Sequence, residues 1–192
     1  MEDSTYMIGK KQKSGYEIRV HGWKYKGNQI GDWYYEKVYD EGKVAIDSII
    51  NFIAYCDTNP INTIKKFKHN ELDRTRGYFY EVDVNDKLSE GDTLRIDLQF
   101  WHDTTRFEKR VGNTFFIFLP QSKSNYCNSN KHVIDSFPIR DNKANLRMIA
   151  PEKGKYTLLG YYILFDKKQS LQLHDSLIKA YEVHVEMNFE VK

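Results

Sequence analysis

The sequence predicts an all-β fold in which an N-terminal antiparallel meander, residues 1–76, is joined to an immunoglobulin-like β-sandwich, residues 77–192. Two observations support this prediction. Aromatic residues make up 15% of the 192-residue chain, and aromatic side chains suit the half-buried surface of a strand. Apolar and polar residues also alternate in several runs, as they do in strands that bury one face. A chain of this length buries enough surface to fold without a metal or a crosslink.

Short aromatic and β-branched runs between glycines define the expected strands of the meander. These strands are predicted at residues 16–25, 33–39 and 44–55, with turns at 27–31 and 40–42 and one further short strand with a turn within 57–76. The end of the third run also fits helical periodicity, but its β-branched residues and the nearby turn favour a strand. We therefore expect a meander from the first strand onward.

Residue alternation defines most strands of the expected sandwich. It predicts strands at 78–84, 94–100, 156–165 and 181–191, and a continuous apolar run predicts another at 115–119. Residues 121–155 are polar, and we expect a largely irregular connection that holds at most one short strand near 146–149. Helix is expected to be scarce, because only residues 171–180 have room for a short one.

Charge and composition exclude several classes of protein. The net charge of +2 and the pI of about 8.3 are too mild for a nucleic-acid-binding domain, so no nucleic-acid partner is expected. No apolar run reaches the roughly 18 residues of a membrane-spanning helix, and the acidic, polar start does not resemble a signal peptide. Cys56 and Cys127 lie far apart and lack metal-ligand spacing. We favour two unpaired cysteines over a disulfide.

One segment carries a resemblance to a known family. The run Gly27-Asn28-Gln29-Ile30-Gly31-Asp32-Trp33-Tyr34-Tyr35, followed by Gly42-Lys43, resembles the MORN-like repeats of proteins labelled antitoxin components. The earlier segment 11–16 looks like a degenerate preceding copy, so the resemblance covers about residues 9–50. The insert at 37–40 is long for this family, and no regular array of repeats follows.

The remainder, through residues 62–68 and 78–82, looks like secreted or lipid-anchored proteins of Bacteroidetes in which such a meander precedes a sandwich. This resemblance implies a lipoprotein or other protein of the cell envelope or periplasm, with a signal peptide absent from the present sequence. A cytoplasmic location is the alternative. The resemblance implies no known chemistry.

The sequence lacks the motifs that would indicate an enzyme. It has no phosphate-binding loop, dinucleotide fingerprint, zinc-protease helix or serine-hydrolase elbow, so we expect no catalytic site, cofactor or metal. The pairs His102-Asp103 and His174-Asp175 are adjacent, and neighbours on a strand point to opposite faces. His184 is expected to be solvated on the polar face of the last strand. The oxygen-rich segment 83–86 lacks the glycine and glutamate of a calcium loop and is interpreted as a turn.

Two regions remain as candidate binding sites. Five aromatic residues of the meander are candidate ligand-binding residues: Trp23, Tyr25, Trp33, Tyr34 and Tyr35. Alternation sends Trp33 and Tyr35 to one face and Tyr34 to the other, so at least one ring should stay near solvent; packing of one face onto the sandwich is the alternative. The excess of positive charge in 121–155 suggests either a solvated loop or a surface for an acidic ligand.

Taken together, these features predict a non-catalytic binding or interaction protein of the bacterial cell envelope. A carbohydrate-binding module that uses the exposed aromatic residues is one alternative. A cytoplasmic immunity or antitoxin-like partner of another protein is the other. The partner is expected to be a protein or a glycan, and neither its identity nor the oligomeric state follows from the sequence.

Overall fold

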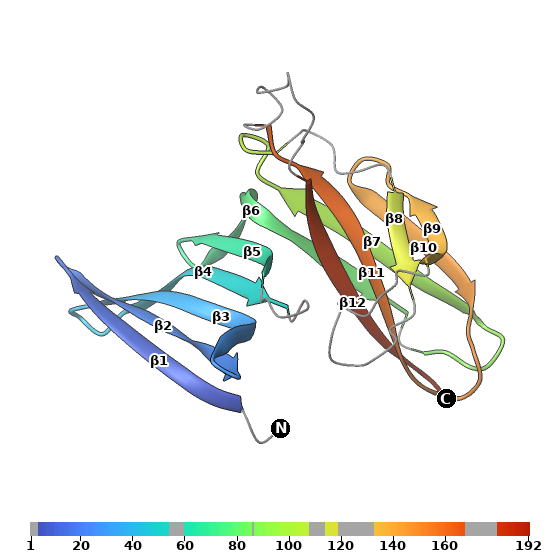
Figure 1. Ribbon diagram of the computed structural model, residues 1–192, viewed down its shortest axis with the longest axis horizontal. Coiled ribbons are helices and arrows are strands. Elements are labelled where there is room, and N and C mark those ends of the chain that lie inside the picture. Colours follow the sequence, from blue (N-terminus) through green and yellow to red (C-terminus); the bar gives the residue numbers. More distant parts are fainter. Residues whose placement is uncertain (1–3, 54–59, 86, 108–113, 119–132, 168–179) are drawn as a thin grey trace. The chain divides into compact units, whose positions relative to one another are not determined.

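The computed structural model describes residues 4–53, 60–85, 87–107, 114–118, 133–167 and 180–192 (Figure 1). Its regular elements are twelve strands: β1 (Ser4–Lys13), β2 (Tyr16–Tyr25), β3 (Asn28–Tyr39), β4 (Val44–Phe52), β5 (Ile61–Lys68), β6 (Glu71–Val84), β7 (Thr93–His102), β8 (Thr114–Phe118), β9 (Val133–Pro138), β10 (Lys143–Ile149), β11 (Gly154–Phe165) and β12 (Ala180–Val191). The all-β fold with an N-terminal meander is confirmed. Cys56, Cys127 and most of the segment 171–180 lie outside the described residues.

The strands form two antiparallel sheets. One has the order β1-β2-β3-β4-β5-β6-β7-β10, and the other has the order β12-β11-β8-β9. The chain divides into two compact units between Tyr78 and Phe79, inside β6. The first unit therefore contains β1 to β5 and the start of β6, and the second contains the rest of β6 and all later strands.

The first unit is a meander in which each strand pairs with the next, as Figure 1 shows for β1 to β5. Most of its side chains are half-buried or exposed, and its few buried ones include Trp33, Ser48, Asn62 and Thr63. The unit accordingly depends on its ladder of backbone hydrogen bonds and on cross-strand side-chain pairs. Eight of the nine large apolar residues recorded as exposed in the described chain belong to it.

Tight turns fix the register of the hairpins. Lys26 and Gly27 connect β2 to β3, and His69 and Asn70 connect β5 to β6; all four residues have positive φ. Two consecutive positive φ values are what a type I′ hairpin turn requires, and this turn matches the twist of the flanking strands. The turn expected at 27–31 is thus shorter than predicted, and β3 already begins at Asn28.

Strand β6 is longer than expected because it passes through a bulge instead of beginning at Gly77. The pairing with β5 shifts from Lys66↔Asp73 to Lys65↔Gly77, which leaves three β6 residues without a partner on β5. Gly77 has a φ of 80°, and a Cβ there would collide with the carbonyl oxygen of Ile64. Only glycine fits this position, so Gly77 marks a bulge within a strand.

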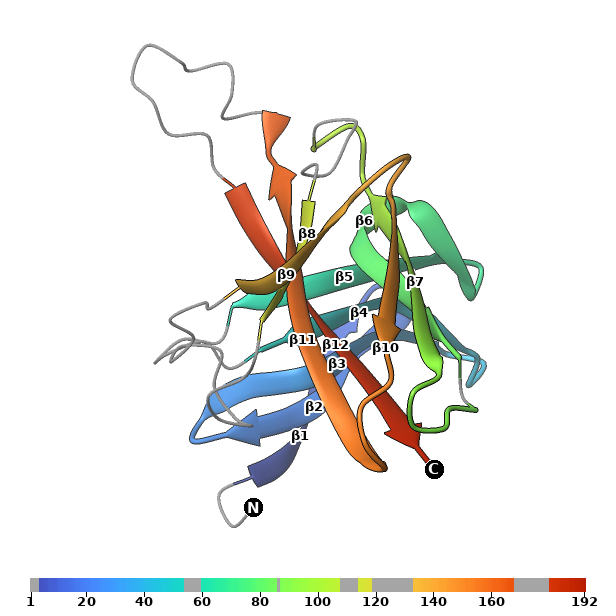
Figure 2. The ribbon, with the colours of Figure 1, turned by 90° about the vertical axis from the view of Figure 1, so that its right-hand side faces the viewer.

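The second unit is a two-sheet β-sandwich with a continuous apolar core, whose layers can be followed in Figure 2. Phe100 on β7 contacts Tyr162 on β11 at a ring-centroid distance of 4.3 Å and lies 6.0 Å from Phe115 on β8. All three side chains are fully buried. Each such side chain contributes roughly 1.5–3 kcal/mol when buried. The more specific immunoglobulin-like topology remains a prediction.

The segment 121–155 differs from the irregular connection that we expected. Residues 121–132 lie outside the described chain, but the remainder contains β9 and β10. Strand β10 buries Ala144 and Leu146 while its alternate residues are exposed, so it pairs with β7 as an ordinary half-buried strand. The positive charges of its outer face are partly neutralised, since Arg147 lies 3.1 Å from Asp97.

His184 is also placed differently from our prediction. Alternation puts it on the outer face of β12, but its side chain is only 3% exposed. It lies directly opposite Tyr161 on β11, which in turn stacks on Phe116 of β8 at 5.0 Å. Aromatic neighbours therefore cover this part of the outer face, and the histidine packs among them.

Candidate functional site

The structure places the five candidate aromatic residues on the two faces of the sheet, three on one face and two on the other. Trp23 and Tyr25 on β2 are 50% and 38% exposed, whereas Tyr34 on β3 is half-buried. The register pairs His21 with Tyr34, so Tyr34 shares a face with Trp23 and Tyr25, which alternate with His21 along β2. Trp33 and Tyr35 belong to the opposite face.

Trp33 is a structural residue of the meander. Its side chain is 5% exposed, and its indole Nε1–H donates a hydrogen bond to the carbonyl oxygen of Trp23 at 3.0 Å. The ring lies against Gly22, where a Cβ would come within 2.6 Å of the ring atoms. The register shifts between His21 and Trp23, so that residues 31–33 of β3 lie opposite this single glycine. This bulge leaves room for the Trp33 ring. Because Trp33 is almost fully buried and packs on Gly22, we leave it out of the candidate surface.

The exposed face instead gains two residues that the sequence did not identify as candidates, Tyr6 and His21. Tyr6 on β1 lies opposite Trp23, with their rings 5.2 Å apart in an edge-to-face arrangement. The Tyr6 hydroxyl is 2.5 Å from Nδ1 of His21, and the His21 ring stacks on Tyr34 at 5.2 Å with an interplanar angle of 9°. Aromatic contacts of this geometry add about 0.5–1.5 kcal/mol each to area burial.

We call Tyr6, His21, Trp23, Tyr25 and Tyr34 the aromatic row. These five side chains cross three neighbouring strands on one face of the sheet. The hydrogen bond and ring contacts among four of them hold the rings in fixed orientations before any ligand arrives. A row of this kind can stack against a planar or apolar ligand surface at a low cost in conformational entropy.

Polar groups flank the aromatic row on both sides. On one side, Glu36 lies 3.5 Å from Nε2 of His21 and 3.9 Å from Arg19. On the other side, Asn51 donates a hydrogen bond to Asp32 at 2.8 Å, and Asn62 donates to Asn51 at 3.3 Å. Asp32 is exposed on the same face as Tyr34, two residues along β3. Both hydrogen-bond donors and acceptors are therefore available beside the rings.

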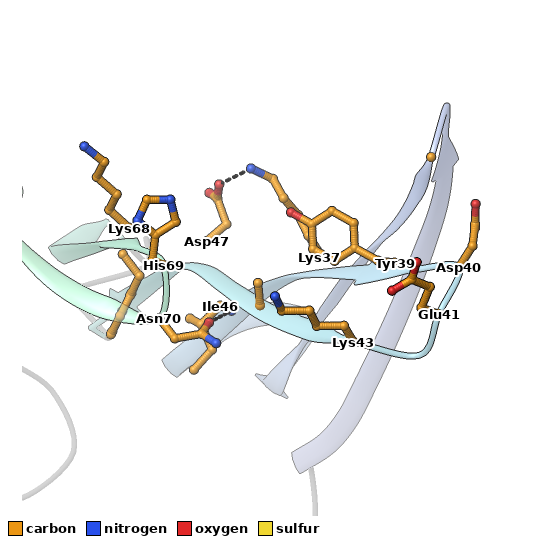
Figure 3. Close-up of a pocket in the computed structure, with 13 residues that line it drawn as sticks. Lys37, Tyr39, Asp40, Glu41, Lys43, Ile46, Asp47, Lys68, His69 and Asn70 are labelled. Carbon is orange, nitrogen blue, oxygen red and sulfur yellow. Dashed lines mark hydrogen bonds and ion pairs between the residues drawn. The ribbon is translucent and has the colours of Figure 1, made fainter.

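The meander also contains a groove of about 620 Å³ between the β3–β4 and β5–β6 turns, shown in Figure 3. Its lining includes Lys37, Asp47, Lys43 and Asn70. Nζ of Lys37 lies 2.9 Å from Oδ1 of Asp47, and this hydrogen bond, together with the charge of Asp47, raises the pKa of Lys37. Partial burial opposes the ionisation of Asp47, but the hydrogen bond from Lys37 and the charge of the nearby Lys66 outweigh it and lower the pKa of Asp47.

This groove presents no chemistry of its own. Lys37 and Asp47 neutralise each other, and Asn70 accepts a hydrogen bond from the backbone N–H of Ile46 at 3.0 Å. Charges of both signs surround the opening. The groups that line it are consistent with hairpin-stabilising roles, and we assign it no ligand.

The remaining candidate residues have structural roles where the structure describes them. Asp103 accepts hydrogen bonds from the N–H and hydroxyl of Thr105 at 2.8 and 2.6 Å. Asn85 accepts from the N–H of Arg95 at 2.8 Å and donates to the Thr93 carbonyl at 3.2 Å. Within the described ranges, no three histidine, cysteine or acidic side chains gather as metal ligands. His174 lies outside the described residues.

Comparison with known proteins finds no match to this chain among protein-family models, curated proteins or solved structures. The fold and the surface together define a class: an all-β protein with a meander that presents an aromatic row and a second unit built as a sandwich. In the part of the chain that the structure describes, no helix has the length and apolar character needed to cross a bilayer. The resemblance to MORN-like repeats remains a prediction.

Proposed function

We propose that this protein is a non-catalytic binding protein and that the aromatic row is its binding surface. The observation that carries this proposal is the exposure of Trp23 within a row whose neighbouring rings are already fixed. Tryptophan and tyrosine dominate the energetics of binding surfaces because they offer a large contact area with few rotatable bonds. An indole that is half exposed within such a row is well placed for such a role.

The apolar side chains around the row support the same proposal. Tyr6, Ile8, Trp23 and Tyr25 are all exposed on one face of β1 and β2. Large apolar groups gathered on one surface typically mark interaction sites, whereas scattered single residues need no explanation. The envelope location implied by the resemblance is part of this proposal, and a partner in that compartment would meet the row directly.

Carbohydrate is the ligand class that one further observation favours. Sugars present apolar C–H faces that stack on aromatic rings, and hydroxyl groups that need both donors and acceptors. Asp32 and Asn51 supply these polar groups near Tyr34 of the aromatic row, and the hydrogen bond between them orients the Asp32 carboxylate. A purely protein-binding surface has no special need for an oriented carboxylate at the end of an aromatic row.

The proposal is tested by comparing Trp23→Ala with Tyr39→Ala on an array of immobilised hexose and N-acetylhexosamine oligosaccharides. Tyr39 is the matched control, because it is a 39% exposed aromatic residue of the same unit on the opposite face of β3. We expect Trp23→Ala to lose about 2 kcal/mol of binding free energy, which is an affinity about 30-fold weaker. Tyr39→Ala should bind like the wild type.

Equal binding by both variants would contradict the assignment of the row. Absence of binding to any glycan would remove the carbohydrate candidate. A pull-down that recovers the same protein with the wild type and Tyr39→Ala, but not with Trp23→Ala, would then support a protein ligand. Recovery of nothing that depends on Trp23 would contradict the binding role itself.

A further inference from the structure

The first half of strand β1 forms an edge of the meander that carries no charged side chain. Strand β1 is the terminal strand of its sheet and pairs only with β2, in an unbroken register from Ser4↔Tyr25 to Lys13↔Tyr16. Three consecutive large apolar residues of this strand are exposed, with fractions of 45% for Tyr6, 40% for Met7 and 60% for Ile8. An extended edge with apolar side chains on both faces is a template for pairing with another strand.

Two other edge strands of the molecule are protected in the usual way. Strand β12 exposes a glutamate at every fourth position, Glu182, Glu186 and Glu190, and strand β10 exposes Lys143 and Arg147. Charged side chains on edge strands prevent pairing with a second chain. The first half of β1 has no charged residue, no proline and no bulge, and no other strand of the described residues pairs with its outer edge.

We propose that β1 pairs antiparallel with β1 of a second copy of this chain and forms a symmetric dimer. Three lysines at positions 10, 11 and 13 decide the orientation. Parallel pairing in register would place each lysine beside its own copy, and like charges directly opposite each other are destabilising. Antiparallel pairing moves the lysines of the two copies to opposite ends of the ladder.

The two-fold symmetry of the dimer limits which residues of the two β1 strands can lie opposite each other. A two-fold axis between antiparallel edge strands is perpendicular to the sheet and passes between two copies of the same residue. An axis at Met7 places Tyr6 opposite Ile8 of the second copy and Lys10 opposite Ser4. This register pairs the exposed apolar residues with one another. An axis at Ile8 would place Tyr6 opposite Lys10 instead.

The same symmetry makes the corresponding faces of both copies continuous. Tyr6 and Ile8 alternate along β1 on the face of the aromatic row, because Tyr6 pairs with Trp23 and Ile8 with His21. Pairing across the axis would bring the two rows onto one surface and double its length. The dimer does not depend on the proposed function, but it would give a binding row two equivalent halves.

The first test is the mass of the full chain in solution, measured by light scattering over a concentration series. We expect twice the chain mass of 22.8 kDa at high concentration and dissociation on dilution. Met7→Lys places two lysines opposite each other at the axis and should give the monomer mass. The control is Ile149→Lys, which adds the same charge at an exposed position of edge strand β10 and should leave the dimer intact.

The second test determines the register by disulfide trapping in a Cys56→Ser, Cys127→Ser background that retains the far-UV spectrum of the wild type. Cα atoms of paired residues lie about 4.5–5.5 Å apart, within the reach of a disulfide. Met7→Cys should therefore form a covalent dimer. Lys11→Cys should not, because eight residues of strand, about 27 Å, would separate the two thiols.

The results have direct consequences for the proposal. The proposal is supported if the dimer mass is lost in Met7→Lys and kept in Ile149→Lys, and if only Met7→Cys forms the covalent dimer. A monomer at every concentration overturns it and leaves an extended segment of another protein as the partner of this edge. A dimer that survives Met7→Lys, or that is trapped equally well at Lys11→Cys, also overturns the proposed pairing.

Discussion

The packing of Trp33 on Gly22 gives the most specific prediction about stability. Trp33→Ala removes about 150 Å² of apolar burial, which at about 25 cal/mol per Å² corresponds to about 4 kcal/mol. Gly22→Ala puts a Cβ within 2.6–2.7 Å of three ring atoms, among them the atom that joins the ring to the rest of the side chain. A rotation of the ring cannot relieve this contact, so we expect a loss of about 3 kcal/mol.

The two substitutions should be strongly coupled. Once Trp33 is replaced by alanine, the Cβ at position 22 has no ring to meet, and Gly22→Ala should cost nothing or stabilise the strand slightly. The coupling free energy is then about 3 kcal/mol, at the upper end of the range for residues in contact. Gly9→Ala is the matched control, because its nearest neighbouring atom lies 3.8 Å away, and its effect should stay within about 0.5 kcal/mol.

Urea unfolding followed by far-UV circular dichroism measures the four free energies of this cycle. If Gly22→Ala costs as much in the Trp33→Ala background as in the wild type, the ring does not lie on this glycine. The register shift that we describe between β2 and β3 would then also be incorrect.

Three further predictions concern other parts of the chain. The double variant Cys56→Ser, Cys127→Ser should keep a cooperative melting transition, because a core of this size does not need a crosslink; loss of that transition would contradict us. The lowered pKa of Asp47 means that its stabilisation is present above the ordinary value of 3.8 and is lost as the pH falls through the folded value. At neutral pH the free energy of unfolding of the wild type should therefore be higher than that of Asp47→Asn, by less than about 1 kcal/mol. A difference of the same size at about pH 2 would show that it does not come from the ion pair. Circular dichroism of the whole chain should show less than about a quarter helix, and more would refute the all-β assignment.

Much of the fold was predictable wherever strands bury one face. The four alternating runs of the second half correspond to β6, β7, β11 and β12. The ends differ by at most two residues, except that β6 begins at Glu71, before the bulge. Alternation predicts such strands because burial on one side selects apolar residues at every second position. Strand β10 follows the same rule. The turn before it is formed by Asp141 and Asn142, which both adopt positive φ, and this Asp-Asn pair is the sequence signal that could have identified the strand.

The residues that sequence reasoning missed are those that lack a burial pattern. Strand β1 is exposed at nine of its ten positions, so no alternation distinguishes it, and Tyr6 was not recognised as part of the candidate site. Trp33 is among the candidate ligand-binding residues of the sequence because alternation cannot show that a glycine on the neighbouring strand receives its ring. His184 was expected in solvent because alternation gives the face of a strand but not what covers that face.

The indole N–H signals of the three tryptophans test the binding role of the aromatic row most directly. Trp33 donates to the Trp23 carbonyl oxygen at 3.0 Å, and Trp101 donates to Glu81 at 3.0 Å, whereas Trp23 is half exposed. A titration with the best-binding oligosaccharide from the array, followed by ¹H–¹⁵N correlation spectra, should shift the Trp23 indole signal most and leave that of Trp101 in place. A largest shift at Trp101, or saturation of binding without a shift at Trp23, would show that the ligand binds elsewhere and would contradict the proposed surface.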